Sequence, residues 1–206
     1  MTQLSPILID EVIEPEFDEA LHAYTVNGAG VPSVTQLMQP LTSCVYGSIN
    51  ADVLRAAAEF GTAVHACTEL LDEDDLDPES VEPDWMPYLD AYKAWKADVS
   101  PVIDAIELRL GCSRYCGTID RLCVIAGEPW VVDLKTTSTL HEHVGVQLAA
   151  YEALAARKFG QRYRRAALQL RGDGTYRFRE YRKPDDAACF AALLNLNFWM
   201  KNHGYR

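Results

Sequence analysis

Residues 115–135, YCGTIDRLCVIAGEPWVVDLK, decide the fold class of this chain. Two runs rich in β-branched and apolar residues, 115–125 and 130–135, lie on either side of the pair Ala126-Gly127. Short runs of this composition around a glycine-containing turn are typical of a β-hairpin. Together with the preceding apolar run at 106–110, they predict an antiparallel β-meander.

Helical patterns flank the meander on both sides in the sequence. Asn50 or Asp52 is expected to cap a long helix, in which alanines and larger apolar residues form a stripe. Thr139 and Glu142 form a capping-box pattern, and Gly160 marks the end of the helix that follows. The expected set comprises helices at 33–38, 51–71, 85–99, 142–158 and 184–201, and a second hairpin at 163–170 and 175–182.

The first fifty residues are expected to form a lead-in to the main fold. Residues 22–26 alternate, a turn follows, and Ser33 is placed to cap a short helix. A chain of 206 residues is long enough for one well-buried core and gives no reason to divide it. We therefore predict one domain over 1–206, with the lead-in at 1–50, a core at about 51–183 and a C-terminal helix at 184–206.

The composition is that of an ordinary globular protein, with 49% hydrophobic and 24% charged residues. No stretch approaches the roughly 18 apolar residues that span a bilayer, and the N-terminus is acidic, so neither a membrane partner nor export is expected. The cysteines are scattered without a CxxC pair, which favours free thiols and argues against an iron–sulfur cluster. We expect a cytoplasmic protein.

The net charge of −11 is divided unevenly along the chain. Residues 1–110 hold 4 Lys/Arg and 21 Asp/Glu, net −17, whereas residues 111–206 hold 15 and 9, net +6. Residues 157–183 alone contain ten basic residues against two acids. A phosphate-binding surface is therefore expected in the C-terminal half, although an ordinary solvated sheet face stays open as the alternative. The expected DNA contacts in this half are Arg164, Arg177 and Arg179.

The hairpin brings two aspartates together. If Ile125 pairs with Glu128 across the turn, the numbers of each cross-strand pair add to 253, so Asp120 lies opposite Asp133. Like charges at this separation, roughly 5 Å between Cβ atoms, repel each other. A divalent cation offsets the repulsion, and hard carboxylate oxygens suit Mg²⁺ or Mn²⁺. The alternative is a surface cluster at a strand edge, and a register shift of one residue would separate the two side chains.

Lys135 joins the two aspartates on the same face. The period of two in a strand places Asp133 and Lys135 on one side, and Trp130, Val132 and Leu134 on the other, in the core. A bound divalent ion acidifies water and acts as a Lewis acid, and an ammonium group beside it stabilises developing negative charge. The trio therefore supplies the groups that phosphodiester hydrolysis needs.

Two of the predicted helices carry polar pairs at positions i and i+4. His65 and Glu69 share one face with Gly61, and a glycine there permits close approach to a sheet. Gln147 and Tyr151 offer an amide and a phenol on one face of the later helix. We interpret the first pair as candidate metal ligands and the second as contacts to a phosphate or a base edge. In the alternative interpretation, His65 is an ordinary packed residue and Tyr151 belongs to the core.

Four motifs, in this order, resemble those of RecB-type PD-(D/E)XK nucleases, among them phage recombination exonucleases and CRISPR adaptation nucleases. The motifs are GTAVHACTE at 61–69, GTIDR at 117–121, VDLKTT at 132–137 and QLAAY at 147–151. The resemblance implies an α/β (α+β) fold in which helices flank a central mixed β-sheet, with a restriction-endonuclease-like core. The lead-in also looks like that of phage-encoded members, on a weaker match.

The resemblance implies a role for each matching residue. Lys135 would be the catalytic lysine, and Glu69, Gln147 and Tyr151 would complete the catalytic site. Arg121 and Thr136, which belong to the same motifs, join the expected DNA contacts. The metal would be held by His65, Asp120, Asp133 and the backbone carbonyl of Leu134.

The activity implied is that of a DNA nuclease dependent on Mg²⁺ or Mn²⁺, expected to be an exonuclease of phage or bacterial recombination and repair. Single- or double-stranded DNA is the expected partner, with a recombinase, a single-strand annealing protein or further copies of the chain as additional candidates. Two departures from the family stand out: Ile119 occupies the first position of the PD pair, and the cysteine cluster of iron–sulfur members is missing.

Two other classes of function stay open. The first is a non-catalytic DNA-binding accessory protein of recombination, which would be marked by loss of an aspartate or the lysine, and none is lost. The second is an acidic interaction protein that mimics DNA. It would use residues 72–84, which contain eight carboxylates and are interpreted as a solvated loop and not as a metal cage. Only a nuclease would degrade DNA when metal is added.

Overall fold

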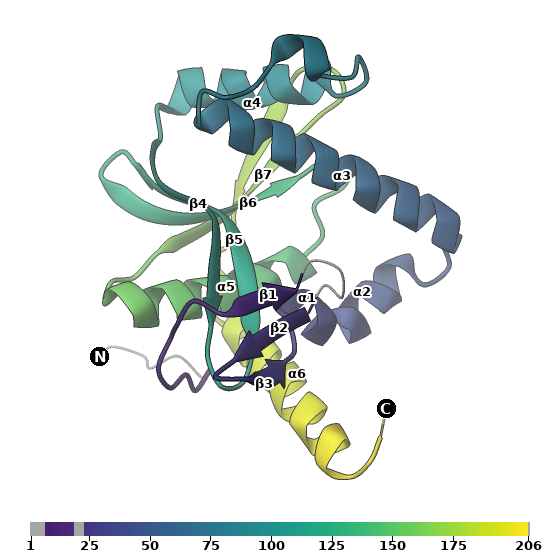
Figure 1. Cartoon of the computed structure of the whole chain (residues 1–206), viewed down its shortest axis with the longest axis vertical. Helices are drawn as coiled ribbons and strands as arrows, with labels where there is room; N and C mark the ends of the chain where they lie inside the picture. The colour runs from purple at the N-terminus through teal and green to yellow at the C-terminus, as the bar shows by residue number, and fades with distance from the viewer. Residues whose placement is uncertain (1–6, 19–22, 206) are drawn as a thin grey trace.

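The fold is a mixed α+β arrangement around a five-stranded sheet (Figure 1). The computed structural model describes residues 7–18 and 23–205. The strand order is β4-β5-β6-β7-β8, and neighbours are antiparallel except for the parallel pair β6 and β7. The predicted meander and the central mixed sheet flanked by helices are both confirmed. The strands are β4 (Val102–Gly111), β5 (Cys116–Ile125), β6 (Glu128–Lys135), β7 (Arg164–Leu170) and β8 (Tyr176–Glu180).

Helices cover both faces of this sheet (Figure 1). On one face α3 and α4 pack against apolar side chains that include Trp130 and Val132. On the other face α1, α5 and α6 pack against side chains that include Ile119 and Val131. The alternation in the sequence predicted that only one side of β6 lies in the core, but both sides are buried, because a helical layer lies on each. The helices are α1 (Val34–Leu37), α2 (Gln39–Tyr46), α3 (Ala51–Asp72), α4 (Met86–Val99), α5 (His143–Phe159) and α6 (Asp185–Asn202), with a 3-10 turn at Pro78–Ser80.

The lead-in forms a second, antiparallel sheet of β1 (Glu16–Asp18), β2 (Ala23–Val26) and β3 (Ala29–Val31). Ser33 then caps α1 with a complete capping box, which confirms the predicted short helix; α2 was not predicted. The backbone N–H of Cys116 donates to the Pro32 carbonyl at 3.0 Å, so the end of the lead-in is attached to β5. His22, part of the predicted alternating segment, lies outside the described residues.

The β5–β6 hairpin has the predicted register. Its ladder runs from residues 121 and 132 to residues 125 and 128, and each pair of numbers adds to 253. Ala126 and Gly127 have φ angles of 52° and 82°, the left-handed values that both central positions of a type I′ turn require. The turn therefore sets which β5 residue faces which β6 residue.

The starts of two helices test the predicted caps. The Asn50 side chain accepts a hydrogen bond from the Asp52 backbone N–H at 2.7 Å and caps α3, as expected. The capping box assigned to Thr139 and Glu142 is wrong, because α5 begins directly after Glu142, whose side chain makes no bond to the helix end. Glu142 instead forms an ion pair with Arg179 of β8, so a tertiary contact replaces the local cap.

The six cysteines are free thiols, as expected from their spacing. Cys116 and Cys123 lie within β5, and burial raises the pKa of each thiol to about 12. Thiols of this kind are packing residues and not nucleophiles. Among the described helices, none combines the length and apolarity needed to cross a bilayer.

Candidate active site

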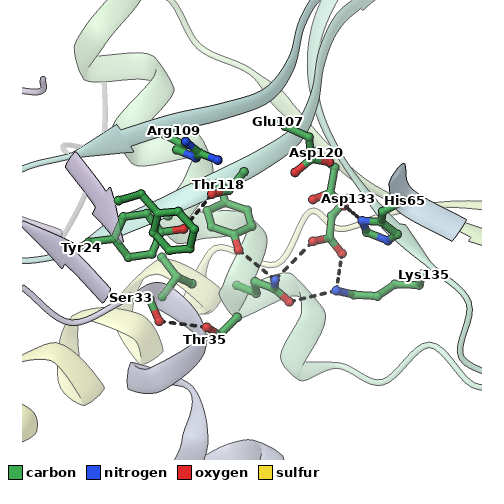
Figure 2. A pocket seen from close by; sticks show the side chains of 15 residues that line it. Tyr24, Ser33, Thr35, His65, Glu107, Arg109, Thr118, Asp120, Asp133 and Lys135 are labelled. Carbon is green, nitrogen blue, oxygen red and sulfur yellow. Dashed lines mark hydrogen bonds and ion pairs between the residues drawn. The ribbon is translucent and has the colours of Figure 1, made fainter. Parts of the chain in front are cut away.

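A cavity of about 340 Å³ is lined by the central sheet, α1, α3, α5 and the lead-in (Figure 2). Figure 2 shows Glu107, Asp120, Asp133, His65 and Lys135 gathered at one end, while polar residues of the lead-in, β4 and β5 lie at the other. The structure therefore brings together side chains from four of the predicted motif regions. The residues singled out from the sequence that line the cavity are His65, Asp120, Asp133, Lys135, Gln147 and Tyr151.

Asp120 is fixed at the centre of the carboxylate end. Its Oδ2 atom accepts a hydrogen bond from the Leu134 backbone N–H at 2.6 Å, so a side chain of β5 extends the ladder to β6. The Leu134 carbonyl in turn accepts from His65 Nε2 at 3.1 Å, and His65 Nδ1 lies 3.7 Å from Asp120 Oδ2. Helix α3 and the hairpin are thus joined through polar atoms at this point.

His65, Glu107 and Asp120 form a group that can hold a metal ion. One ligand atom from each lies within 4.8 Å of the others. Asp120 was predicted as a metal ligand and belongs to this group, Glu107 of β4 joins it, and Asp133, also predicted as a ligand, is not among its members. Two ionised carboxylates at this separation repel each other unless a cation lies between them, and oxygen donors of this kind suit Mg²⁺ or Mn²⁺.

Glu107 was missed by the sequence analysis. It lies between the β4–β5 pairs Ile106↔Arg121 and Leu108↔Ile119, which places it across from Asp120. Its φ angle is 45°, a left-handed value that is costly for a residue with a side chain and that gathers at functional sites. Cross-strand numbers in this ladder add to 227 near Glu107, so applying the hairpin arithmetic to the β4–β5 turn would have found it.

The Glu107 carboxylate has few stabilising contacts among the described residues. Its Oε1 atom is buried without a hydrogen-bond partner among the described residues, and the nearest cationic atom, Arg121 Nη1, is 3.6 Å away. Burial and then the charge of Asp120 raise the pKa of Glu107 to about 8. A buried oxygen without a donor is costly unless it meets a cation, so the donor set fits a divalent ion.

Asp133 belongs to a different chain of contacts. Its Oδ2 atom forms an ion pair with Lys135 Nζ at 2.7 Å, and its Oδ1 atom accepts from Gln147 Nε2 at 3.2 Å. Gln147 Oε1 accepts from Lys135 at 3.3 Å, and the amide also donates to the Tyr151 hydroxyl at 3.1 Å. The QxxxY residues of α5 therefore hold both the aspartate and the lysine in place.

Burial and charge set the protonation of this pair. Burial raises the pKa of Asp133 to about 6, although Lys135 opposes the shift. Burial alone would lower the pKa of Lys135, but the charges of Asp133 and Asp120 outweigh it and raise that pKa above its ordinary value. Lys135 is thus a cation at neutral pH.

Close packing at Gly117 completes this wall of the cavity. A Cβ atom at Gly117 would lie 2.5 Å from Cε1 of Tyr151, so only glycine permits the ring to occupy its position. Burial raises the pKa of Tyr151 well above its ordinary value. The phenol therefore stays protonated and serves as a packed hydrogen-bonding group, which combines the two interpretations drawn from the sequence.

The opposite end of the cavity is polar and carries a cation (Figure 2). The Tyr24 and Thr118 hydroxyls are 2.8 Å apart, and the Ser33 and Thr35 hydroxyls are 2.9 Å apart. Arg109 of β4 reaches the same end, with its guanidinium carbon 4.9 Å from the centre of the Phe17 ring. Apart from the lead-in match, no sequence signal singled out this end, because its residues come from three distant segments.

Glu69 and Thr136 fall outside the cavity. Glu69 is half-buried one turn beyond His65 on α3, and its charge contributes to the raised pKa of Glu107 without making it a member of the metal-binding group. Thr136 follows β6, and its Oγ1 atom would lie 3.3 Å from a Cβ atom at Gly61. The predicted close approach at Gly61 is therefore to the residue after β6.

Arg121 does not occupy the surface position expected of a DNA contact. Its side chain is 0% exposed, and its Nε atom forms an ion pair with Asp72 Oδ2 at 2.8 Å. Asp72, which the sequence analysis placed in the solvated acidic loop, is the last residue of α3 and is equally buried. The two opposite charges form a buried pair, because an unpaired charge is unstable in the protein interior.

The expected basic track is partly neutralised. Arg164 forms a two-pronged bond to Glu180, with both distances at 2.8 Å, and its guanidinium stacks over the Trp130 ring. Arg179 donates to the Leu140 carbonyl at 2.8 Å and pairs with Glu142. Arg177 is exposed and makes no ion pair within the described ranges. Of the three predicted contacts, Arg177 is the one whose charge is open to a ligand.

Comparison of the chain with protein-family models and with curated proteins finds no match to either. The arrangement of side chains in the cavity therefore carries the functional interpretation.

Proposed function

We propose that this protein is a divalent-metal-dependent DNA nuclease of the PD-(D/E)XK type that acts as an exonuclease in phage or bacterial recombination or repair. The observation that carries the proposal is a single cavity in which His65, Glu107 and Asp120 approach within 4.8 Å beside the Asp133–Lys135 ion pair. This combination joins a cation-binding group to a fixed ammonium, and phosphodiester hydrolysis uses both.

His65, Glu107 and Asp120, with the neighbouring Leu134 carbonyl, would hold Mg²⁺ or Mn²⁺. When bound, such an ion lowers the pKa of water and polarises a phosphoryl oxygen. Lys135 keeps its proton because Asp133 is 2.7 Å away, so its ammonium group can stabilise negative charge that develops on the phosphate. Gln147 forms hydrogen bonds with both Lys135 and Asp133 and so fixes their relative positions, which limits the reorganisation needed during the reaction.

The lead-in end of the cavity supports exonuclease action. Arg109 and the hydroxyls of Tyr24, Thr118 and Ser33 offer a cation and hydrogen-bonding groups in the same cavity as the carboxylates. Such groups suit a phosphate. A phosphate held there beside the cleavage site favours a chain end over the interior of a strand.

The proposal is tested with purified protein and end-labelled single- and double-stranded DNA, in Mg²⁺, in Mn²⁺ and in EDTA. Stepwise loss of nucleotides in metal, and no cleavage in EDTA, is the expected result. Lys135→Ala is compared with Lys93→Ala, a matched control that removes an exposed lysine of α4. Cleavage by wild type and Lys93→Ala but not by Lys135→Ala supports the proposal. DNA that stays intact with wild-type protein in both metals contradicts it and favours the non-catalytic DNA-binding alternative.

A further inference from the structure

Arg121 lies directly behind the candidate metal-binding group, in a pocket of buried polar atoms. Besides the Asp72 ion pair, its Nε atom donates to the Tyr92 hydroxyl at 3.1 Å. Asp72 also accepts from that hydroxyl at 2.5 Å and from Lys96 at 2.6 Å. A buried charge held by this many partners is fixed in position, because any displacement of the side chain would weaken several buried hydrogen bonds at once.

The Arg121 guanidinium contacts two members of the metal-binding group directly and is linked to the third through Thr68. Its Nη1 atom donates to the backbone carbonyl of Asp120 at 2.7 Å and lies 3.6 Å from Glu107 Oε1. Its Nη2 atom donates to Thr68 Oγ1 at 3.0 Å, and Thr68 in turn donates to the His65 carbonyl at 2.8 Å. The three groups come from β5, β4 and α3, so the contacts of Arg121 tie three separate elements together.

The three elements need a contact that holds their ligand-bearing residues together at this point. The carboxylates of Glu107 and Asp120 lie close together across the ladder, and the left-handed backbone of Glu107 is strained for a residue with a side chain. Arginine suits the task because its guanidinium is planar, permanently charged and presents donors in a rigid fork. A lysine has the same charge without that fork.

We propose that Arg121, anchored by Asp72, is a positioning residue that holds His65, Glu107 and Asp120 in the arrangement that receives a divalent ion. The proposal rests on the metal site of the proposed function and adds to it the residue that presets the ligands. It replaces the DNA contact expected for Arg121 from the sequence. Groups that orient metal ligands govern affinity without touching the metal.

The test compares two variants and a control. Arg121→Lys keeps the charge but loses the fork, and Thr68→Val keeps the shape of the side chain but removes the hydroxyl link to His65. Lys96→Met is the matched control, since it removes the other cation that contacts Asp72 and leaves every contact of Arg121 in place. Each protein is titrated with Mn²⁺ alone while electron paramagnetic resonance follows free and bound ion, and Tm is measured on the same samples.

Arg121→Lys is expected to weaken Mn²⁺ binding by about 10- to 100-fold and Thr68→Val by about 10-fold, with a changed spectrum of the bound ion in both. Lys96→Met is expected to lower Tm while affinity and spectrum stay those of wild type. Because Thr68→Val removes only one hydroxyl, it keeps the test valid if Arg121→Lys does not fold.

The outcomes separate this proposal from the proposed function. Wild-type affinity and spectrum in Thr68→Val and in folded Arg121→Lys overturn the positioning role alone. Equal losses of affinity in Lys96→Met and Thr68→Val also overturn it, since a general loss of stability would then explain both. A wild-type protein that binds Mn²⁺ but leaves DNA intact overturns the nuclease and not the positioning role, whereas one that binds no Mn²⁺ overturns both.

Discussion

Asp120 has a carboxylate neighbour on each side, and the two neighbours differ. Asp133 on β6 already has its cation, since Lys135 is 2.7 Å away, and Gln147 donates to its other oxygen. Glu107 on β4 has only a guanidinium nitrogen at 3.6 Å and an oxygen without a hydrogen-bond partner among the described residues. The Asp133 side is thus complete, with an ion pair at 2.7 Å, while the Glu107 side is incomplete, because its nearest positive charge, on Arg121, is 3.6 Å away. The geometry thus groups Asp133 with the lysine, and Glu107 with Asp120 and His65 in the candidate metal-binding group.

The largest expected effect is on the complete side. Lys135→Ala is expected to lower the rate of DNA cleavage by roughly 100- to 1,000-fold, because a fixed cation beside the reacting phosphate is lost. Asp133→Ala is expected to lower it as strongly, since Lys135 loses its anchor. Both chains should stay folded by circular dichroism. Single-turnover rates in saturating Mn²⁺ measure the effect, and near-wild-type rates in both variants would remove this pair from the reaction.

The incomplete side is tested through metal affinity. Glu107→Gln removes a charged ligand and is expected to weaken Mn²⁺ binding by about 100-fold, the upper end of what altered ligand surroundings cost. Asp133→Asn is expected to weaken it much less, because Asp133 lies outside the metal-binding group. Calorimetric titration of the two variants side by side gives the comparison. The division between the two carboxylates is wrong if Asp133→Asn has the larger effect.

The loss of stability as pH rises should be larger without metal than with it. Glu107 and Asp133 have pKa values raised to about 8 and about 6, above the ordinary values near 4.3 and 3.9 of an unfolded chain. The folded protein binds these protons more tightly, so the contribution is fully present below about pH 4 and is lost as pH rises through about 6 and 8.

The metal-free protein is therefore expected to lose Tm between pH 5 and pH 9 by several degrees, where about 1 kcal/mol corresponds to roughly 2–4 °C. Added Mg²⁺ should restore more Tm at pH 8 than at pH 5, because it replaces the protons. Thermal melts in EDTA and in Mg²⁺ across this range make the test. A gain from Mg²⁺ that is larger at pH 5 contradicts it.

The smallest effect concerns the surface arginines. The combined Arg177→Ala and Arg179→Ala variant is expected to make the slope of log affinity against log salt shallower by about 1, the contribution of one phosphate contact. Arg177→Ala alone should give nearly the same change, because Glu142 already occupies Arg179. DNA binding is measured in Ca²⁺ over a range of salt. An unchanged slope removes Arg177 from the contact surface.

Local signals in the sequence were enough for most of the elements and for half of the site. The Ala126-Gly127 turn sets the β5–β6 register, so the positions of Asp120 and Lys135 on the hairpin could be predicted from the sequence alone. Asn50 and Ser33 could be identified as caps because a capping side chain bonds to a backbone N–H only a few residues away. In each of these cases, the residues that determine the local structure lie close together in the sequence.

Long-range contacts account for what was missed. Glu107 could be found only by extending the cross-strand arithmetic to the β4–β5 turn, because no neighbouring residue in the sequence marks the position or its left-handed backbone. The Asp72–Arg121 ion pair joins residues 49 apart, and Asp72 is the first member of an acidic run whose other members are solvated. A charge pattern gives the average exposure of a segment and cannot single out the one carboxylate that a distant arginine buries.

The hydrogen bond between His65 Nε2 and the Leu134 carbonyl decides which ring nitrogen is available. A carbonyl oxygen can only accept, so the proton is on Nε2, and in the neutral ring the lone pair is left on Nδ1, the atom 3.7 Å from Asp120. Folding therefore selects the imidazole tautomer, and an arriving ion would find the basic nitrogen already on the side of the carboxylates. Binding of an ion at this site would therefore need no prior exchange of tautomers at His65.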